Sequence, residues 1–111
     1  MFERERIGTV DVIHGADALV KEHLEPFTEL LGGCVDAGQP KAVLDLRDVP
    51  LIDSAGLETL LELQEKFEGY GGALKLLVSR GLCRDILDAT GVDSQFEIFG
   101  DTREAVGSFA E

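Results

Sequence analysis

The chain has 111 residues, of which 44% are hydrophobic and 29% are charged. This size and composition predict one soluble globular domain over residues 1–111, large enough to bury a hydrophobic core. The formal net charge is −12, from 22 acidic and 10 basic residues. Such a surface repels phosphate backbones and anionic lipids, so nucleic-acid binding is disfavoured, whereas a basic protein surface would be attracted. The alternative is that the acidity only confers solubility.

Neither membrane insertion nor export is indicated. No apolar run approaches the about 20 residues that a membrane-spanning helix needs. The opening Met1-Phe2-Glu3-Arg4-Glu5-Arg6 lacks the apolar segment of a signal peptide. We therefore expect a cytoplasmic protein. Cys34 and Cys83 are far apart in the chain and form no CxxC pair, so free buried thiols are expected.

The N-terminal part of the chain predicts a β-hairpin followed by a helix. Thr9–Ile13 alternates in polarity and is typical of a strand, which pairs with a shorter strand near Phe2–Arg6. Apolar residues at helical spacing then predict a helix over about His23–Val35, with Pro26 tolerated in its first turn. This leaves Gly15–Glu22 as a loop.

The rest of the chain alternates strands and helices. The predicted strands are Ala42–Leu46, Ala73–Val78 and Phe96–Phe99, and the predicted helices are about Ala55–Glu68, Leu82–Ala89 and Asp101–Ala110. Leu57, Leu60, Leu61 and Phe67 are assigned to the apolar side of the helix at Ala55–Glu68. The order β-β-α-β-α-β-α-β-α implies an α/β domain with a mostly parallel sheet of about five strands, four helices and right-handed crossovers.

Functional loops in such a sheet gather at the carboxyl ends of the strands. Here these loops are Gly15–Glu22, Arg47–Asp53 and Ser79–Gly81. The second loop leads directly into a helix, so Asp53 and Ser54 fall at a helix N-terminus. Unpaired N–H groups and the helix dipole favour negative charge there.

Two interpretations of these residues remain open. Asp and Ser are preferred N-caps, so Asp53 or Ser54 could serve only to pair the free amides of the helix. Alternatively, Ser54 is a phosphate acceptor. Gly56 is a poor helix former, and its missing side chain would then leave Ser54 open to a large partner.

A family resemblance favours the phosphate acceptor. Leu44-Asp45-Leu46, Val49 and Ile52-Asp53-Ser54-Ala55-Gly56-Leu57 together resemble the signature of STAS domains, specifically of bacterial anti-sigma factor antagonists. Gly71-Gly72 before Leu74-Lys75-Leu76, and Thr90-Gly91-Val92 before Phe96, lie where that family has similar segments. The resemblance covers the chain from about Thr9 to Phe109, and it departs from the family pattern in the Gly15–Glu22 loop.

The resemblance implies a switch in protein binding and no enzymatic activity, cofactor or metal. In that family, a partner that is both serine kinase and anti-sigma factor phosphorylates the serine at the position of Ser54. The unphosphorylated protein binds this partner and frees a sigma factor, phosphate blocks the binding, and a phosphatase restores it. The expected partner-binding residues are Asp53, Ser54, Ala55 and Gly56 of the motif, together with Asp17 and Ser79 of the two flanking loops.

Other functions fit the sequence less well. Ser54 lies in no GxSxG elbow, no spacing pairs it with a histidine, and His14, His23 and Cys34 lack zinc-ligand spacing. The alternatives that stay open are a STAS adaptor subunit of a transport assembly, which is never phosphorylated, and a STAS module that binds a small ligand.

Overall fold

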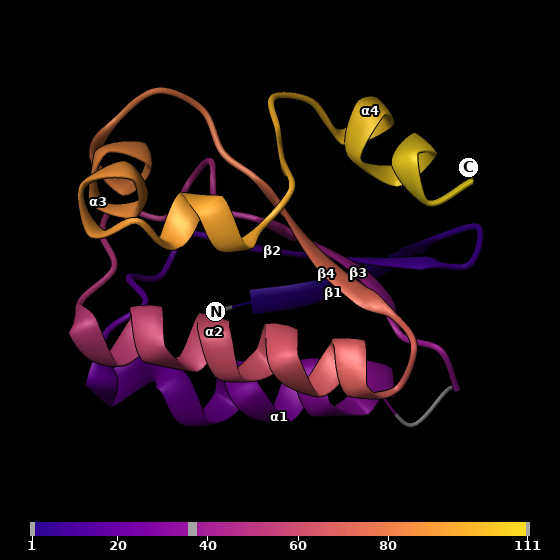
Figure 1. The fold of residues 1–111 in the computed structure, drawn as a ribbon. Coiled ribbons are helices and arrows are strands. Elements are labelled where there is room, and N and C mark those ends of the chain that lie inside the picture. Colours follow the sequence, from indigo (N-terminus) through magenta and orange to yellow (C-terminus); the bar gives the residue numbers. More distant parts are fainter. Residues whose placement is uncertain (1, 36–37, 111) are drawn as a thin grey trace.

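A β-hairpin forms one edge of the sheet in the computed structural model, which describes residues 2–35 and 38–110. β1 (Phe2–Ile7) and β2 (Val10–Gly15) are antiparallel and turn at Gly8, whose φ of 62° suits glycine. β3 (Lys41–Asp45), β4 (Ala73–Leu77) and β5 (Ile98–Phe99) follow in spatial order and are parallel to β2. The expected α/β architecture is confirmed (Figure 1).

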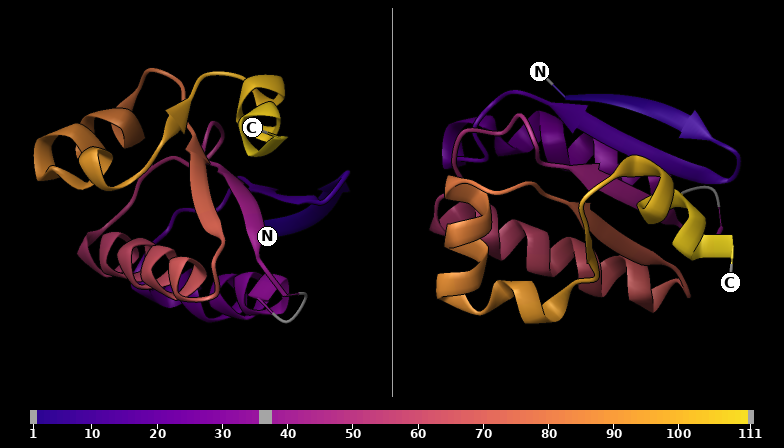
Figure 2. Two further views of the ribbon diagram at one scale, coloured as in Figure 1. Left: turned by 45° about the vertical axis from the view of Figure 1, so that its right-hand side comes forward. Right: turned by 90° about the horizontal axis from the view of Figure 1, so that it is seen from above.

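Helices cover both faces of the sheet. α1 (Leu24–Val35) and α2 (Ser54–Gly69) run side by side on one face, and α4 (Thr102–Gly107) lies on the opposite face (Figures 1 and 2). α3 (Leu82–Thr90) packs at one end of the molecule and closes at Gly91 in the left-handed conformation. Three short 3₁₀ helices complete the chain, at Lys21–His23, Val92–Gln95 and Ser108–Ala110.

The prediction for α2 was wrong in one residue of its apolar side. Leu61 is 37% exposed, whereas Leu63 is buried together with Leu60 and Phe67. Positions 56, 60, 63 and 67 form the stripe that faces the sheet at 3.6 residues per turn, and Leu61 lies about 100° away from Leu60 around the helix axis.

The last strand is shorter than predicted. β5 contains only Ile98–Phe99, although the Glu97 carbonyl still accepts a 3.0 Å hydrogen bond from Leu76 N. The preceding residues form the 3₁₀ helix Val92–Gln95 and place Phe96 in the core. Lys75, buried on the α4 face, donates to Ser108 Oγ at 2.8 Å and lies 4.2 Å from the Phe109 ring centroid. These contacts hold the C-terminal turn against the sheet.

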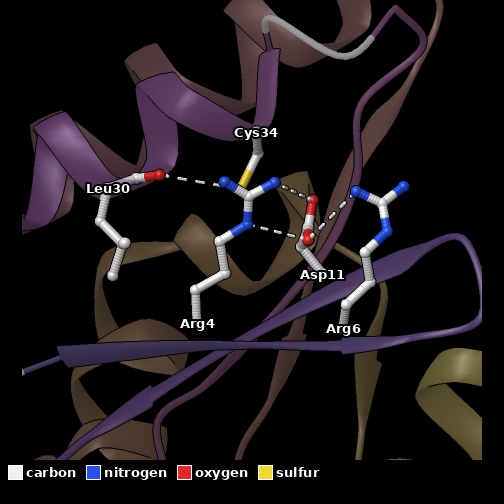
Figure 3. Close-up of polar contacts among 5 residues, drawn as sticks. All are labelled: Arg4, Arg6, Asp11, Leu30 and Cys34. Atoms are coloured by element: carbon white, nitrogen blue, oxygen red, sulfur yellow. Dashed lines mark hydrogen bonds and ion pairs between the residues drawn. The ribbon is translucent and has the colours of Figure 1, made fainter.

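A buried acid joins the hairpin to α1. Asp11 is 2% exposed, and its carboxylate accepts hydrogen bonds from Arg4 at 2.9 and 3.3 Å, with Arg6 3.8 Å away (Figure 3). Cys34 of α1 lies beside this group, and its thiol hydrogen-bonds the Leu30 carbonyl. Burial raises the pKa of Cys34 to about 11, so the thiol stays protonated at neutral pH. Cys34 and Cys83 are both free and buried, as predicted.

The sheet topology brings the carboxyl ends of β2, β3 and β4 to one edge. The loops that follow these strands lie at this edge, and α2 starts there. None of the helices in the described ranges is long and apolar enough to span a bilayer.

Candidate functional site

The loop after β2 is bound to the loop that precedes α2. Leu19 forms a parallel bridge with Ile52, and both side chains are buried. Leu19 N donates to the Leu51 carbonyl at 3.0 Å, and Asp53 N donates to the Leu19 carbonyl at 3.1 Å. We call this contact between residues 19–21 and 51–56 the loop clasp. It fixes the position of the α2 N-terminus relative to β2.

Both oxygens of the Asp53 carboxylate are used in the loop clasp. Oδ1 accepts from Gly56 N at 2.8 Å and caps α2, and Oδ2 accepts from Lys21 N at 3.1 Å. The Gly56 amide holds the pKa of Asp53 below its ordinary value, and the Lys21 amide lowers it further. Of the two capping candidates from the sequence, Asp53 is therefore the cap.

The structural reason for Gly56 differs from the one expected. Gly56 is buried, and a Cβ there would overlap the Leu19 carbonyl oxygen and lie 2.8 Å from Ile52 Cγ2. Its missing side chain thus admits the Leu19 backbone and does not open the surface around Ser54. This gives a structural reason for the glycine at position 56.

Ser54 is the first residue of α2 and is exposed. Its hydroxyl makes no hydrogen bond to another residue within 2–35 and 38–110, because the amides at this helix end are directed to Asp53. The hydroxyl is therefore accessible and takes no part in holding the helix end.

The other predicted residues lie around the same edge but not in one contact group. Ala55 is half-buried beside Ser54, and Asp17 lies half-buried in the loop after β2. Ser79 is exposed in the loop after β4, where it lines a separate hollow with Arg80 and Arg84. This loop leads into α3, which is tied to the loop before α2 because Cys83 Sγ donates to the Val49 carbonyl at 3.0 Å.

The sequence interpretation missed Leu19 and Lys21, whose backbone groups complete the loop clasp. Backbone donors leave no mark in a sequence, and the available signal is the apolar pair Leu19-Val20 within the loop. Within the described part of the chain, no group of three or more His, Cys, Asp or Glu side chains is arranged to hold a metal ion.

Comparison with known proteins establishes the family. The model of the STAS domain matches residues 3–105, which include every element from β1 to the middle of α4. The chain therefore belongs to the STAS domain family. No curated protein sequence matches it significantly.

Solved structures share the fold at low sequence identity. A candidate anti-sigma factor antagonist from Thermotoga maritima superposes with a TM-score of 0.90 at 22% identity, over 99% of this chain and 95% of that one. An anti-sigma factor antagonist from Mycobacterium paratuberculosis superposes with a TM-score of 0.86 at 20% identity, over 100% of this chain and 94% of that one. The unphosphorylated Bacillus anti-sigma factor antagonist SpoIIAA superposes with a TM-score of 0.73 at 16% identity, over 99% of this chain and 97% of that one. The structure of its phosphorylated form has also been solved.

The close approach at Gly56 predicts the effect of adding one methyl group. Gly56→Ala should lower the free energy of unfolding by about 2 kcal/mol, because the Leu19 backbone must move away from the new Cβ. Gly69→Ala, at the end of the same helix, meets nothing within 4 Å and should be neutral or stabilising by up to about 1 kcal/mol. Urea unfolding compares the two, and equal effects would contradict the account of Gly56.

The lowered pKa of Asp53 predicts a pH-dependent contribution to stability. Since the folded pKa lies below the unfolded value of about 3.9, the ionised carboxylate stabilises the fold above that value. This contribution is lost as the pH falls through the folded pKa. The difference in unfolding free energy between wild type and Asp53→Ala should thus be constant near neutral pH and shrink below about pH 4.

The control for Asp53 is a variant that caps without ionising. Asp53→Asn keeps an acceptor for Gly56 N, so its stability relative to Asp53→Ala should not change with pH. Urea unfolding at a series of pH values measures all three proteins. A wild-type advantage that persists undiminished to pH 2.5 would show that the ionised form of Asp53 is not what stabilises the helix end.

Proposed function

We propose that this chain is an anti-sigma factor antagonist whose binding to its partner is controlled by phosphorylation of Ser54. The observation that carries the proposal is the exposed Ser54 hydroxyl at the start of α2, beside a carboxylate that already caps the helix. Membership of the STAS family and the fold shared with anti-sigma factor antagonists support it. In this proposal the chain acts in the cytoplasm by binding and catalyses no reaction.

The occupied helix end determines where a phosphate on Ser54 would point. A free helix N-terminus attracts a phosphate group through its amides and dipole. Here Asp53 holds the Gly56 amide at 2.8 Å, and its ionised carboxylate repels a second anion. The phosphate of modified Ser54 would therefore project into solvent, where an approaching protein meets it.

A phosphate in that position would weaken binding to a partner that presents a carboxylate near Ser54, even if the rest of the partner surface is basic. It adds about −1.5 to −2 charges at neutral pH. A partner carboxylate about 6 Å away would be repelled by roughly 2–3 kcal/mol at an intermediate effective dielectric. This corresponds to roughly a thirty- to hundredfold loss of affinity, before any steric clash. The proposal requires no large rearrangement of the domain.

The partner in this proposal is an anti-sigma factor with serine kinase activity, and a phosphatase resets the switch. The partner surface would be centred on Ser54 and extend over Asp53, Ala55 and the flanking loops that hold Asp17 and Ser79. The net charge of −12 would steer a basic surface of the partner towards the chain. Gly56 supports this surface from below and makes no contact itself.

Substitution of Ser54 tests the proposal through binding to the purified cognate kinase. Ser54→Ala should bind at least as tightly as the unphosphorylated wild type and should no longer be released after incubation with ATP. Ser54→Asp should bind at least tenfold more weakly, because it places a permanent negative charge at the start of α2. Isothermal titration calorimetry measures both affinities.

The matched control adds the same charge elsewhere. Ser94 is exposed in the 3₁₀ helix Val92–Gln95, and Ser94→Asp should bind like wild type. The proposal fails if Ser54→Asp binds as tightly as Ser94→Asp, or if ATP releases Ser54→Ala as readily as the wild type.

A further inference from the structure

A cavity of about 200 Å³ lies beside the loop clasp, between the start of β1, the loop after β2 and the first turn of α1. It is lined by Phe2, Asp17, Glu22, His23, Pro26 and Phe27. The cavity opens at the carboxyl end of β2, the kind of position at which sheets with parallel strands commonly hold ligands. The proposed partner surface accounts for Asp17 but for none of the other five lining residues.

The floor of the cavity is aromatic. The Phe2 and Phe27 rings lie with their centroids 5.1 Å apart and their planes at 59°. Phe27 is 1% exposed, so its ring is fixed in the core, and Phe2 is half-buried at the edge. The accessible part of the Phe2 ring, with Phe27 behind it, offers an apolar surface to the body of a ligand, and aromatic faces also attract cations.

The rim of the cavity carries acceptors and negative charge. Glu22 contributes an exposed carboxylate, and Asp17 contributes a second carboxylate that already has a partner within the chain. His23 Nδ1 lies 3.1 Å from the Ala18 carbonyl. Since a carbonyl only accepts, Nδ1 carries the hydrogen of this bond.

We propose that this cavity binds a small organic cation, namely a primary ammonium or guanidinium group on an aromatic or short aliphatic body. The body packs on Phe2, which the buried Phe27 supports, and the cation pairs with Glu22. The site does not depend on the phosphorylation of Ser54. It gives a location to the small-ligand-binding alternative that the sequence left open.

Such a ligand would sit next to the loop clasp. Glu22 directly follows Lys21, whose N–H donates to Asp53 at 3.1 Å, and Asp53 directly precedes Ser54. A cation paired with Glu22 therefore lies one residue from the contact that positions the α2 N-terminus. The backbone at Lys21 and Glu22 therefore both borders the cavity and helps to position Ser54.

The test is a nuclear magnetic resonance titration of the ¹⁵N-labelled chain with three probes of similar shape. 2-Phenylethylammonium should bind about fivefold more tightly than neutral 2-phenylethanol, and 3-phenylpropanoate more weakly than either. The largest amide shifts should fall on residues 17–27. Equal affinity for the three probes, no binding by any of them, or shifts centred outside residues 17–27 would each overturn the proposal.

Two variants that each remove one negative charge distinguish binding in the cavity from attraction by the overall negative charge of the chain. Glu22→Gln should weaken 2-phenylethylammonium about threefold and leave 2-phenylethanol unchanged. Glu25→Gln removes the same charge from the first turn of α1 at a residue that does not line the cavity, and it should bind like wild type. If Glu25→Gln weakens the ammonium probe as much as Glu22→Gln does, the attraction comes from the overall field and the site is not specific.

Discussion

The contact between the Leu19 backbone and the start of α2 is the constraint on which the rest of the site depends. It is possible only because position 56 has no side chain, and it aligns two backbone segments through hydrogen bonds of about 3 Å. Residues 19–21 belong to the loop after β2, and residues 51–56 follow β3. The contact therefore joins the loops after β2 and β3 at one edge of the sheet, and it determines the position of Ser54.

This arrangement gives the structural role at the helix end to Asp53 and leaves its neighbour Ser54 without one. Asp53 caps the helix and holds the Lys21 amide, so Ser54 carries no structural duty. A residue with no such duty can be modified without loss of the fold, as a regulatory site requires.

Most of the architecture was predictable from local signals. Alternation in Thr9–Ile13, helical spacing after Leu24 and a glycine at position 91 correspond to β2, α1 and the end of α3. The errors arise where packing decides between similar residues. Periodicity alone did not distinguish Leu61 from Leu63, because their exposure depends on how α2 is rotated against the sheet.

The sequence predicted that Asp53 and Ser54 lie at the start of a helix but did not predict the contacts around them. The motif drew attention to Asp53, Ser54 and Gly56, while the role of Gly56 rests on Leu19, which is 37 positions earlier in the chain. The burial of the charged residues Asp11 and Lys75 could not be predicted from the sequence either, because their partners come from other elements. Through-space contacts between backbone groups leave no periodic pattern to detect.

The central claim is that the Ser54 hydroxyl carries phosphate in the living cell while the domain stays folded. Phosphosite mapping by mass spectrometry of the chain isolated from its native cells tests it most directly. The account predicts a fraction of the chain with one added phosphate, localised to Ser54. A chain that is never modified at Ser54 under any growth condition, or is modified only at another serine, would contradict it.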